Sequence, residues 1–148
     1  MIFRRANRSE LAQIVALLAD DDIAHDREGN ALDLAPYSAA WDEMEAATGN
    51  WTLVAVDGEE VVGVLQLTVI AGLSRNGTKR GQLEGVRVKS LARGKSVGSR
   101  LMKYAIDTAK EAGCGLVQLT TDKRRADAKR FYESLGFTAT HVGMKTIF

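Results

Sequence analysis

The hydrophobic and polar positions of this chain follow two different periods, which predicts a protein that mixes strands and helices. Short alternating or β-branched runs predict strands at residues 2–5, 51–56, 61–70, 82–88 and 116–120. Apolar residues at helical spacing predict helices at residues 7–24, from Pro36 onward, 96–112 and 126–135. We expect a loop over residues 71–81 and two short final strands within residues 137–148.

Turn-forming residues indicate how these elements connect. Asp57 and Gly58 separate two strand-like runs, which favours a β-hairpin. Asn7 or Ser9 can cap the first helix, and Pro36 suits the first turn of the second. The strand–helix–strand unit over residues 82–120 implies a parallel strand pair, whereas the other strands are expected to pair mostly antiparallel. We therefore predict the α/β (α+β) class, with one domain over residues 1–148 and helices on both faces of a mixed sheet.

Composition narrows the function classes. The 148 residues carry a formal net charge of +1, which argues against a general nucleic-acid-binding protein. The single cysteine, Cys114, excludes an intramolecular disulfide and suits a reducing cytoplasm, so we expect a cytoplasmic protein. We also expect no membrane association, because no apolar run approaches the roughly 20 residues that span a bilayer. The two histidines and one cysteine are widely separated, so no metal site is expected.

A basic, glycine-containing turn lies between the strand at 82–88 and the helix that follows it. Arg93, Gly94, Lys95 and Gly98 place positive charge and accessible backbone at the start of that helix. A helix N-terminus offers unpaired N–H groups and the positive end of the helix dipole, so we expect a phosphate-bearing ligand here. The turn lacks the three-glycine fingerprint of dinucleotide-binding proteins and the first glycine of a nucleoside-triphosphate P-loop.

Two segments carry a resemblance to a known family. The turn over residues 92–102 and the later segment 128–137, which contains Phe131-Tyr132 and Leu135-Gly136-Phe137, resemble the GNAT superfamily of acetyl-CoA-dependent N-acyltransferases. The similarity covers essentially the whole chain. It implies that the parallel strand pair at the centre of the sheet is splayed into a V-shaped cleft, with Gly85 as a plausible place for a bulge. It also implies acetyl-CoA as the cosubstrate, and a homodimer is one assembly seen among such proteins.

The resemblance implies a cofactor site and a mechanism. The residues expected to bind coenzyme A are Val86, Arg87, Val88, Arg93, Gly94, Lys95, Ser96, Val97, Gly98, Ser99 and Arg125. Glu84 matches the position of the general base, and Tyr132 matches the tyrosine that gives a proton to the thiolate. The Val86 N–H is the expected oxyanion donor. Glu84 as a carboxylate that only orients substrate or pairs with Arg87, and Tyr132 as a core residue, remain open alternatives.

The sequence departs from the family pattern at two positions. Ser96 stands where the family has the first glycine of the turn; a serine still offers a backbone N–H and is expected to cap the helix. Arg125 stands where many relatives carry an asparagine that contacts coenzyme A, and Arg125 can instead reach a phosphate.

The sequence indicates less about the molecule that accepts the acetyl group than about the molecule that donates it. Acidic residues crowd positions 20–45, which favours a cationic amine, whereas Arg75, Lys79 and Arg80 suit an anionic group on the acceptor. The turn at Arg93 is also similar to that of aminoalkylphosphonate N-acetyltransferases. We expect a primary amine of a small molecule as the acceptor. The alternatives are a protein or peptide amine, a non-catalytic acyl-CoA-binding module, and a nucleic-acid-binding protein that uses the basic residues between 123 and 130.

Overall fold

The computed structural model describes residues 1–20 and 33–148, and the described chain forms two compact units, Met1–Gln118 and Leu119–Phe148. Most of the acidic segment expected near the acceptor lies in residues 21–32, outside the described part. Residues 21–24, the predicted last residues of the first helix, lie there too, whereas the described helix ends earlier, at Ala19. None of the helices in the described ranges is both long and apolar enough to cross a bilayer.

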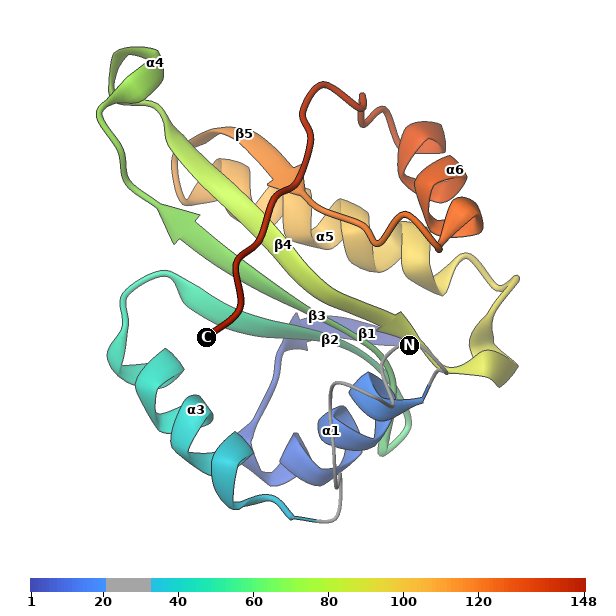
Figure 1. Ribbon diagram of the computed structural model, residues 1–148. Coiled ribbons are helices and arrows are strands. Elements are labelled where there is room, and N and C mark those ends of the chain that lie inside the picture. Colours follow the sequence, from blue (N-terminus) through green and yellow to red (C-terminus); the bar gives the residue numbers. More distant parts are fainter. Residues whose placement is uncertain (21–32) are drawn as a thin grey trace. The chain divides into compact units, whose positions relative to one another are not determined.

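Five strands form one mixed sheet in the order β1-β2-β3-β4-β5 (Figure 1). Their bounds are Ile2–Arg5, Asn50–Asp57, Glu60–Ile70, Lys79–Val88 and Cys114–Leu119. The first three neighbouring pairs are antiparallel, and β4 and β5 are parallel. The β2–β3 hairpin turns at Gly58, whose φ of +62° suits a residue without a Cβ. The predicted mixed, mostly antiparallel sheet is confirmed.

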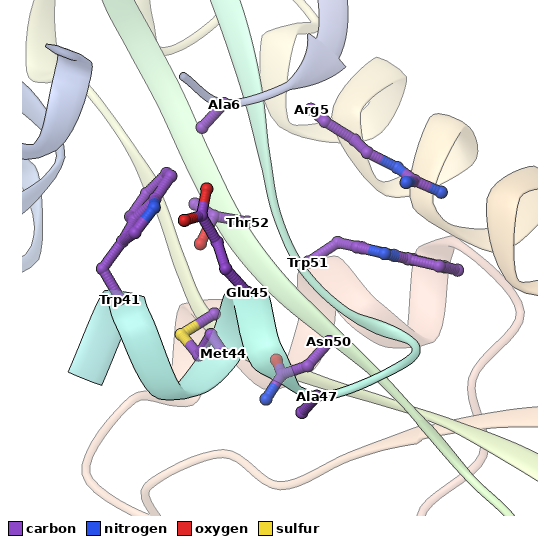
Figure 2. A pocket seen from close by; sticks show the side chains of 9 residues that line it. All are labelled: Arg5, Ala6, Trp41, Met44, Glu45, Ala47, Asn50, Trp51 and Thr52. Carbon is purple, nitrogen blue, oxygen red and sulfur yellow. The ribbon is translucent and has the colours of Figure 1, made fainter. Parts of the chain in front are cut away.

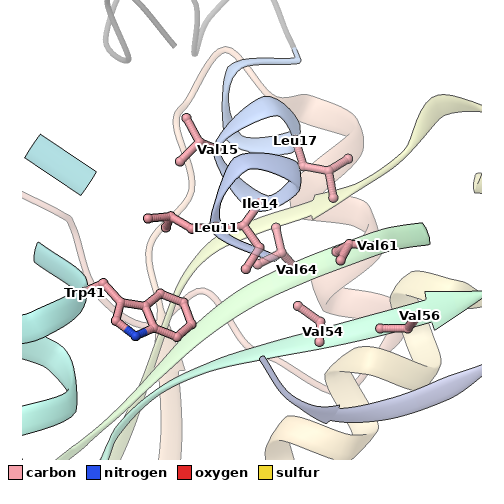
Figure 3. Close-up of a cluster of buried hydrophobic side chains, with 9 residues drawn as sticks. All are labelled: Leu11, Ile14, Val15, Leu17, Trp41, Val54, Val56, Val61 and Val64. Carbon is pink, nitrogen blue, oxygen red and sulfur yellow. The ribbon is translucent and has the colours of Figure 1, made fainter. Parts of the chain in front are cut away.

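Helices cover both faces of this sheet, as predicted. On one face, α1 (Leu11–Ala19) and α3 (Ala35–Ala46) bury a cluster of apolar side chains against β2 and β3 (Figure 3). Trp41 of α3 and Val54 of β2 belong to this cluster and are almost fully buried. On the other face, α5 (Val97–Glu111) places Val97 and Leu101 close to Gly63 of β3, where a Cβ would lie 3.3 Å from Leu101 Cδ2.

An ion pair fixes the chain where it leaves β1 and enters α1. Arg4 donates two hydrogen bonds to the Glu10 carboxylate, at 2.9 and 2.7 Å, and the Asn7 N–H donates a third at 2.7 Å. Glu10 ends a short 3-10 helix, Arg8–Glu10, and is the one polar residue among the buried residues of the described chain. The hydrogen bonds from Arg4 hold the pKa of Glu10 below its usual range, against the effect of burial.

Two expectations need correction. No strand forms over residues 137–148, where Val142, Met144 and Ile147 are exposed. A strand forms only where its backbone groups meet a neighbouring strand and its apolar side meets a covered face. The expected loop at 71–81 is partly regular, since it holds the short α4 (Ser74–Gly77) and the start of β4 at Lys79.

Candidate active site

Strand β4 contains a β-bulge at the position expected to be irregular. Val64 of β3 pairs with Arg87, but Gln66 pairs with Glu84, so Gly85 and Val86 face the single residue Leu65. Gly85 has a φ of +60°, a value that favours glycine. Such a bulge removes backbone groups from the regular ladder and bends the strand. The backbone of β4 is therefore irregular immediately after Glu84.

The bulge also changes which face of the sheet each side chain of β4 occupies. Glu84 pairs with Gln66, which shares a face with Val64 and hence with α1 and α3. Beyond the extra residue, Arg87 lies on that same face and Val88 packs on the α5 face with Val97. An unbroken strand would place residues 84 and 87 on opposite faces. The bulge thus brings a carboxylate and a guanidinium to one face.

Glu84 is exposed on this face. Within residues 1–20 and 33–148, its carboxylate forms no hydrogen bond or ion pair, so the expected alternative of a Glu84–Arg87 pair is not observed. Arg87 instead donates to the Val86 carbonyl oxygen at 2.8 Å. The Glu84 carboxylate is consequently available to a substrate or a water molecule.

Polar side chains that the sequence analysis did not single out share this face with Glu84. Gln66, its partner on β3, donates to Asn50 Oδ1 at 3.0 Å, and Thr68 donates to the same oxygen at 3.3 Å. On the other side, Gln118 of β5 donates to Gln82 of β4 at 2.8 Å. In the sequence these polar residues alternate with leucines that are buried in the structure. That alternation could have indicated that one face of the sheet is polar here.

The basic turn connects β4 to α5 through two tight backbone turns. After a 3-10 helix at Ser90–Ala92, the Arg93 side chain folds back and its Nε donates to the Val88 carbonyl at 3.3 Å. The first hydrogen bond of α5 runs from the Arg100 N–H to the Ser96 carbonyl at 3.0 Å, so the amides of residues 97–99 precede it. Val97 is buried and anchors the start of the helix, while residues 93–96 are exposed. The expected anion site is therefore accessible.

Ser96 adopts a left-handed conformation, with a φ of +59°. This backbone explains why glycine is the usual residue at the position, because an L-residue pays about 1–2 kcal/mol for such a φ. The expected capping role of Ser96 is wrong: its side chain makes no cap hydrogen bond, since a capping side chain belongs to an extended residue. Gly94, with a φ of +79°, completes a turn that depends on two left-handed residues.

Tyr132 and Arg125 lie in the second unit. Tyr132 is on α6 (Ala126–Ser134), which ends in a Schellman motif. Gly136, with a φ of +89°, donates to the Glu133 carbonyl, and the Phe137 N–H donates to the Tyr132 carbonyl at 3.1 Å. The rings of Tyr132 and Phe137 meet edge to face, with centroids 6.1 Å apart. The spacing of this motif thus has a structural reason, which is that the glycine turn holds the tyrosine against Phe137.

Arg125 immediately precedes α6, and its side chain does not cap the helix. Asp122 receives two hydrogen bonds from the Arg124 side chain and one from the Arg124 N–H. These bonds hold the pKa of Asp122 well below its usual range. The approach to α6 is therefore partly neutralised by its own acidic residue.

Neither covalent catalysis through a cysteine nor metal catalysis has much support in the site. Burial raises the pKa of the Cys114 thiol, which disfavours the thiolate that a covalent acyl-enzyme route requires. In the part of the chain that the structure describes, no three His, Cys, Asp or Glu side chains gather as metal ligands would.

Comparison with known proteins agrees with this arrangement. A model of the acetyltransferase (GNAT) family matches residues 13–137. An aminoalkylphosphonate N-acetyltransferase of Salmonella typhimurium is 33% identical over 60% of this chain and 56% of its own length. A rice (Oryza sativa subsp. japonica) protein named as a probable glucosamine 6-phosphate N-acetyltransferase is 39% identical over 50% of this chain and 43% of its own. The match thus spans about half the length of each of these curated relatives.

Among solved structures, a Bacillus halodurans C-125 protein described as a transcriptional regulator is 46% identical. Its TM-score is 0.95, and the match covers 99% of both chains.

Proposed function

This chain belongs to the acetyltransferase (GNAT) family, and we propose that it moves an acetyl group from acetyl-CoA to a primary amine of a small molecule. The observation that carries the proposal is the succession, along one stretch of chain, of the bulge of β4 and the first amides of α5. This stretch of sixteen residues, 84–99, supplies an exposed carboxylate, an irregular strand and the candidate anion site in that order.

The donor fits this path by its chemistry. Backbone groups freed at the bulge can pair with the amides of the pantetheine arm, along Val86–Val88, as an added strand does. The amides of residues 97–99 and the side chain of Lys95 suit the pyrophosphate. Arg125, at the start of α6, is our candidate for a further phosphate contact.

Three groups of this chain then serve the reaction. Glu84 takes a proton from the attacking amine through a water molecule, and the Val86 N–H stabilises the oxygen that becomes negative when the amine adds to the thioester carbon. The carbon–sulfur bond breaks, and Tyr132 gives its phenolic proton to the departing thiolate. The product is the N-acetylated amine. The proton taken up at Glu84 passes through solvent to the Tyr132 phenolate and restores the phenol.

A small-molecule acceptor is favoured by the relatives. Those named for a substrate include an aminoalkylphosphonate and a glucosamine 6-phosphate N-acetyltransferase, both of which act on small amines that carry an anionic group. Arg80 and Lys79 at the start of β4 offer cations for such a group.

The test is release of free thiol from acetyl-CoA in the presence of single amines, amino acids, aminoalkylphosphonates and peptides. We expect turnover with at least one small amine, and the Glu84→Gln variant should change the pH–rate profile. Turnover only with peptides would identify a protein N-acetyltransferase. Saturable binding of acetyl-CoA without turnover on any amine would identify a non-catalytic module, and an unchanged profile in Glu84→Gln would exclude Glu84 as the base.

The description of the 46% identical protein makes nucleic-acid binding the second candidate. The basic residues near α6 give it little support, because Arg130 pairs with Asp127, Lys129 with Glu133 and Arg124 with Asp122. DNA binding that weakens with salt and is displaced by coenzyme A would favour this candidate over acetyl transfer.

A further inference from the structure

A cluster of three hydrogen-bonded side chains, Asn50, Gln66 and Thr68, joins β2 to β3 on the face of the sheet that carries Glu84. The register brings them together, because Asn50 pairs with Thr68, and Gln66 pairs with Glu84 of β4. Figure 2 shows Asn50 on the α3 side of β2, whereas its neighbour Trp51 projects to the opposite side. None of the three belongs to the stretch proposed to bind acetyl-CoA, so the cluster calls for its own explanation.

Both amide hydrogens of Gln66 are used inside this cluster. Gln66 Nε2 donates to Asn50 Oδ1 at 3.0 Å and to Thr68 Oγ1 at 3.4 Å. The Thr68 hydroxyl in turn donates to Asn50 Oδ1 at 3.3 Å. A primary amide carries only two N–H groups, so Gln66 has no hydrogen left to donate. What it still offers to a ligand is its carbonyl oxygen, which can only accept.

This oxygen lies next to a second group that only accepts. Among residues 1–20 and 33–148, no donor reaches Gln66 Oε1, and the atom is not enclosed by protein. Glu84 is the cross-strand partner of Gln66, and side chains in such pairs have Cβ atoms about 4.5–5.5 Å apart. The exposed Glu84 carboxylate also has no donor in the described ranges. Two acceptors from neighbouring strands thus face the same space, and neither can satisfy the other.

An ammonium group is the ligand that two such acceptors select. A primary ammonium has three N–H groups, so it can donate to Gln66 Oε1 and to Glu84 at the same time. Hydrogen bonds that involve a charged partner are about twice as strong as neutral ones. A carboxylate or phosphate group would instead meet two oxygens, so the anionic end of an acceptor is expected to lie away from this pair.

We propose, on the basis of the acetyl transfer inferred above, that Gln66 binds the amine of the acceptor beside Glu84 and selects primary amines. After Glu84 has taken a proton through water, a neutral primary amine keeps two N–H groups. One stays on Gln66 Oε1, the other on the water at Glu84, and the lone pair is left for the thioester. A neutral secondary amine has a single N–H and must give up one of these contacts.

Asn50 and Thr68 act through Gln66 and are positioning residues. Without their oxygens, the Gln66 amide would be free to turn its NH₂ group toward the Glu84 carboxylate. That hydrogen bond would occupy the proposed base and would remove the acceptor oxygen from the amine. The cluster therefore keeps Gln66 in the one orientation that serves the substrate.

Binding is measured first, on the full chain and without turnover. Proton–nitrogen correlation NMR follows the side-chain amide signals of Gln66, which are assigned by their absence in Gln66→Met. The probes are 2-aminoethylphosphonate, glucosamine 6-phosphate and butylamine, each titrated with and without coenzyme A. We expect a saturable shift of these signals with at least one probe, and about fivefold or weaker binding of its N,N-dimethyl analogue, which has a single N–H.

The outcomes separate this proposal from acetyl transfer itself. Saturable binding at Gln66 without turnover on any amine would overturn acetyl transfer and support Gln66 as an amine-binding residue. Turnover on an amine that leaves the Gln66 signals unmoved would support acetyl transfer and overturn the role of Gln66. Signals that no probe moves, with no turnover, would overturn both.

Gln66→Met keeps the length of the side chain and removes its oxygen. It should raise the KM for the amine about fivefold or more, narrow the preference for a primary over an N-methyl amine, and leave the KM for acetyl-CoA unchanged. Gln13→Met is the matched control, because Gln13 of α1 is also bonded to β3, through the Val61 N–H at 2.8 Å, but lies outside the cluster. It should cost stability and leave both KM values unchanged. Equal KM values for the amine in Gln66→Met and Gln13→Met would refute the role of Gln66.

Two variants of Asn50 test the positioning role. Asn50→Asp keeps an oxygen that accepts both hydrogen bonds, so its KM for the amine should stay within about twofold of the wild type. Asn50→Leu removes that oxygen and should raise the same KM about as much as Gln66→Met does. An Asn50→Leu protein that is folded by circular dichroism, has a lower Tm and keeps the wild-type KM would show a purely structural cluster and overturn the positioning role.

Discussion

Replacement of Gly85 by alanine tests whether the bulge of β4 organises both stability and cofactor binding. The φ of +60° at this residue would cost an L-side chain about 1–2 kcal/mol. Alanine has less conformational entropy than glycine in the unfolded chain, which offsets about 0.4–1 kcal/mol of this cost. The new Cβ would also lie 3.3 Å from Leu18 Cδ2, so Leu18 must shift by a few tenths of an ångström. The first two terms leave a net loss of up to about 1.6 kcal/mol, and the shift of Leu18 adds to it, so we expect the free energy of unfolding to fall by about 1–1.5 kcal/mol.

For 148 residues that loss lowers Tm by about 2–6 °C, which thermal denaturation followed by circular dichroism resolves. If the bulge also presents backbone groups to the pantetheine arm, one displaced hydrogen bond is worth about 0.5–1.5 kcal/mol. That corresponds to a rise of about 2- to 12-fold in the KM for acetyl-CoA.

Gly58→Ala is the matched control. Gly58 has a nearly identical φ of +62°, but its Cβ would meet nothing within 4 Å, and it lies in the β2–β3 turn. It should lose slightly less stability and keep the KM for acetyl-CoA. A Gly85→Ala protein as stable as the wild type would refute the strain argument. A destabilised Gly85→Ala protein whose KM matches that of Gly58→Ala would refute the role of the bulge in cofactor binding.

Three further predictions address single contacts. Ser96→Ala should change the free energy of unfolding by less than about 0.5 kcal/mol in a urea titration, because Ser96 makes no cap hydrogen bond; a loss near 1 kcal/mol would restore the capping role. Glu10→Gln should lower stability at pH 7 by about 1–3 kcal/mol, because it leaves Arg4 without its carboxylate. Since the folded pKa of Glu10 is lowered, this stabilisation is present above the unfolded value of about 4.3 and is lost as pH falls through the folded pKa, so the two proteins should converge in acid; a constant difference would contradict the assignment. Tyr132→Phe should reduce turnover while the Kd for coenzyme A changes little, and unchanged turnover would remove Tyr132 as the proton donor.

The sequence was a reliable guide where local chemistry decides the structure. Asp57-Gly58 between two strand-like runs predicted the β2–β3 hairpin, and Pro36 predicted the start of α3. The helix α5 was predicted to within a residue at each end, because a strong apolar stripe and Gly113 define it. In these cases the residues that form an element also carry the signal for it.

The sequence was a poor guide where a partner decides the structure. Residues 137–148 were expected to supply two short strands, yet the described chain has none there, since a strand exists only where another strand completes its hydrogen bonds. Ser96 looked like a helix cap because of its side chain, but the tight turn after Arg93 forces it into a left-handed conformation in which that side chain cannot cap.

By itself, the sequence indicated which residues can adopt unusual backbone conformations and which carry charge: Gly85 was a plausible place for a bulge, and the basic turn at Arg93 is the expected anion site. Only the tertiary structure decided which face each side chain occupies. Glu84 and Arg87 share a face because the pairing of β4 with β3 slips by one residue at Gly85. The physical reason is that side chains alternate with a period of two, so a single extra residue reverses every position that follows it.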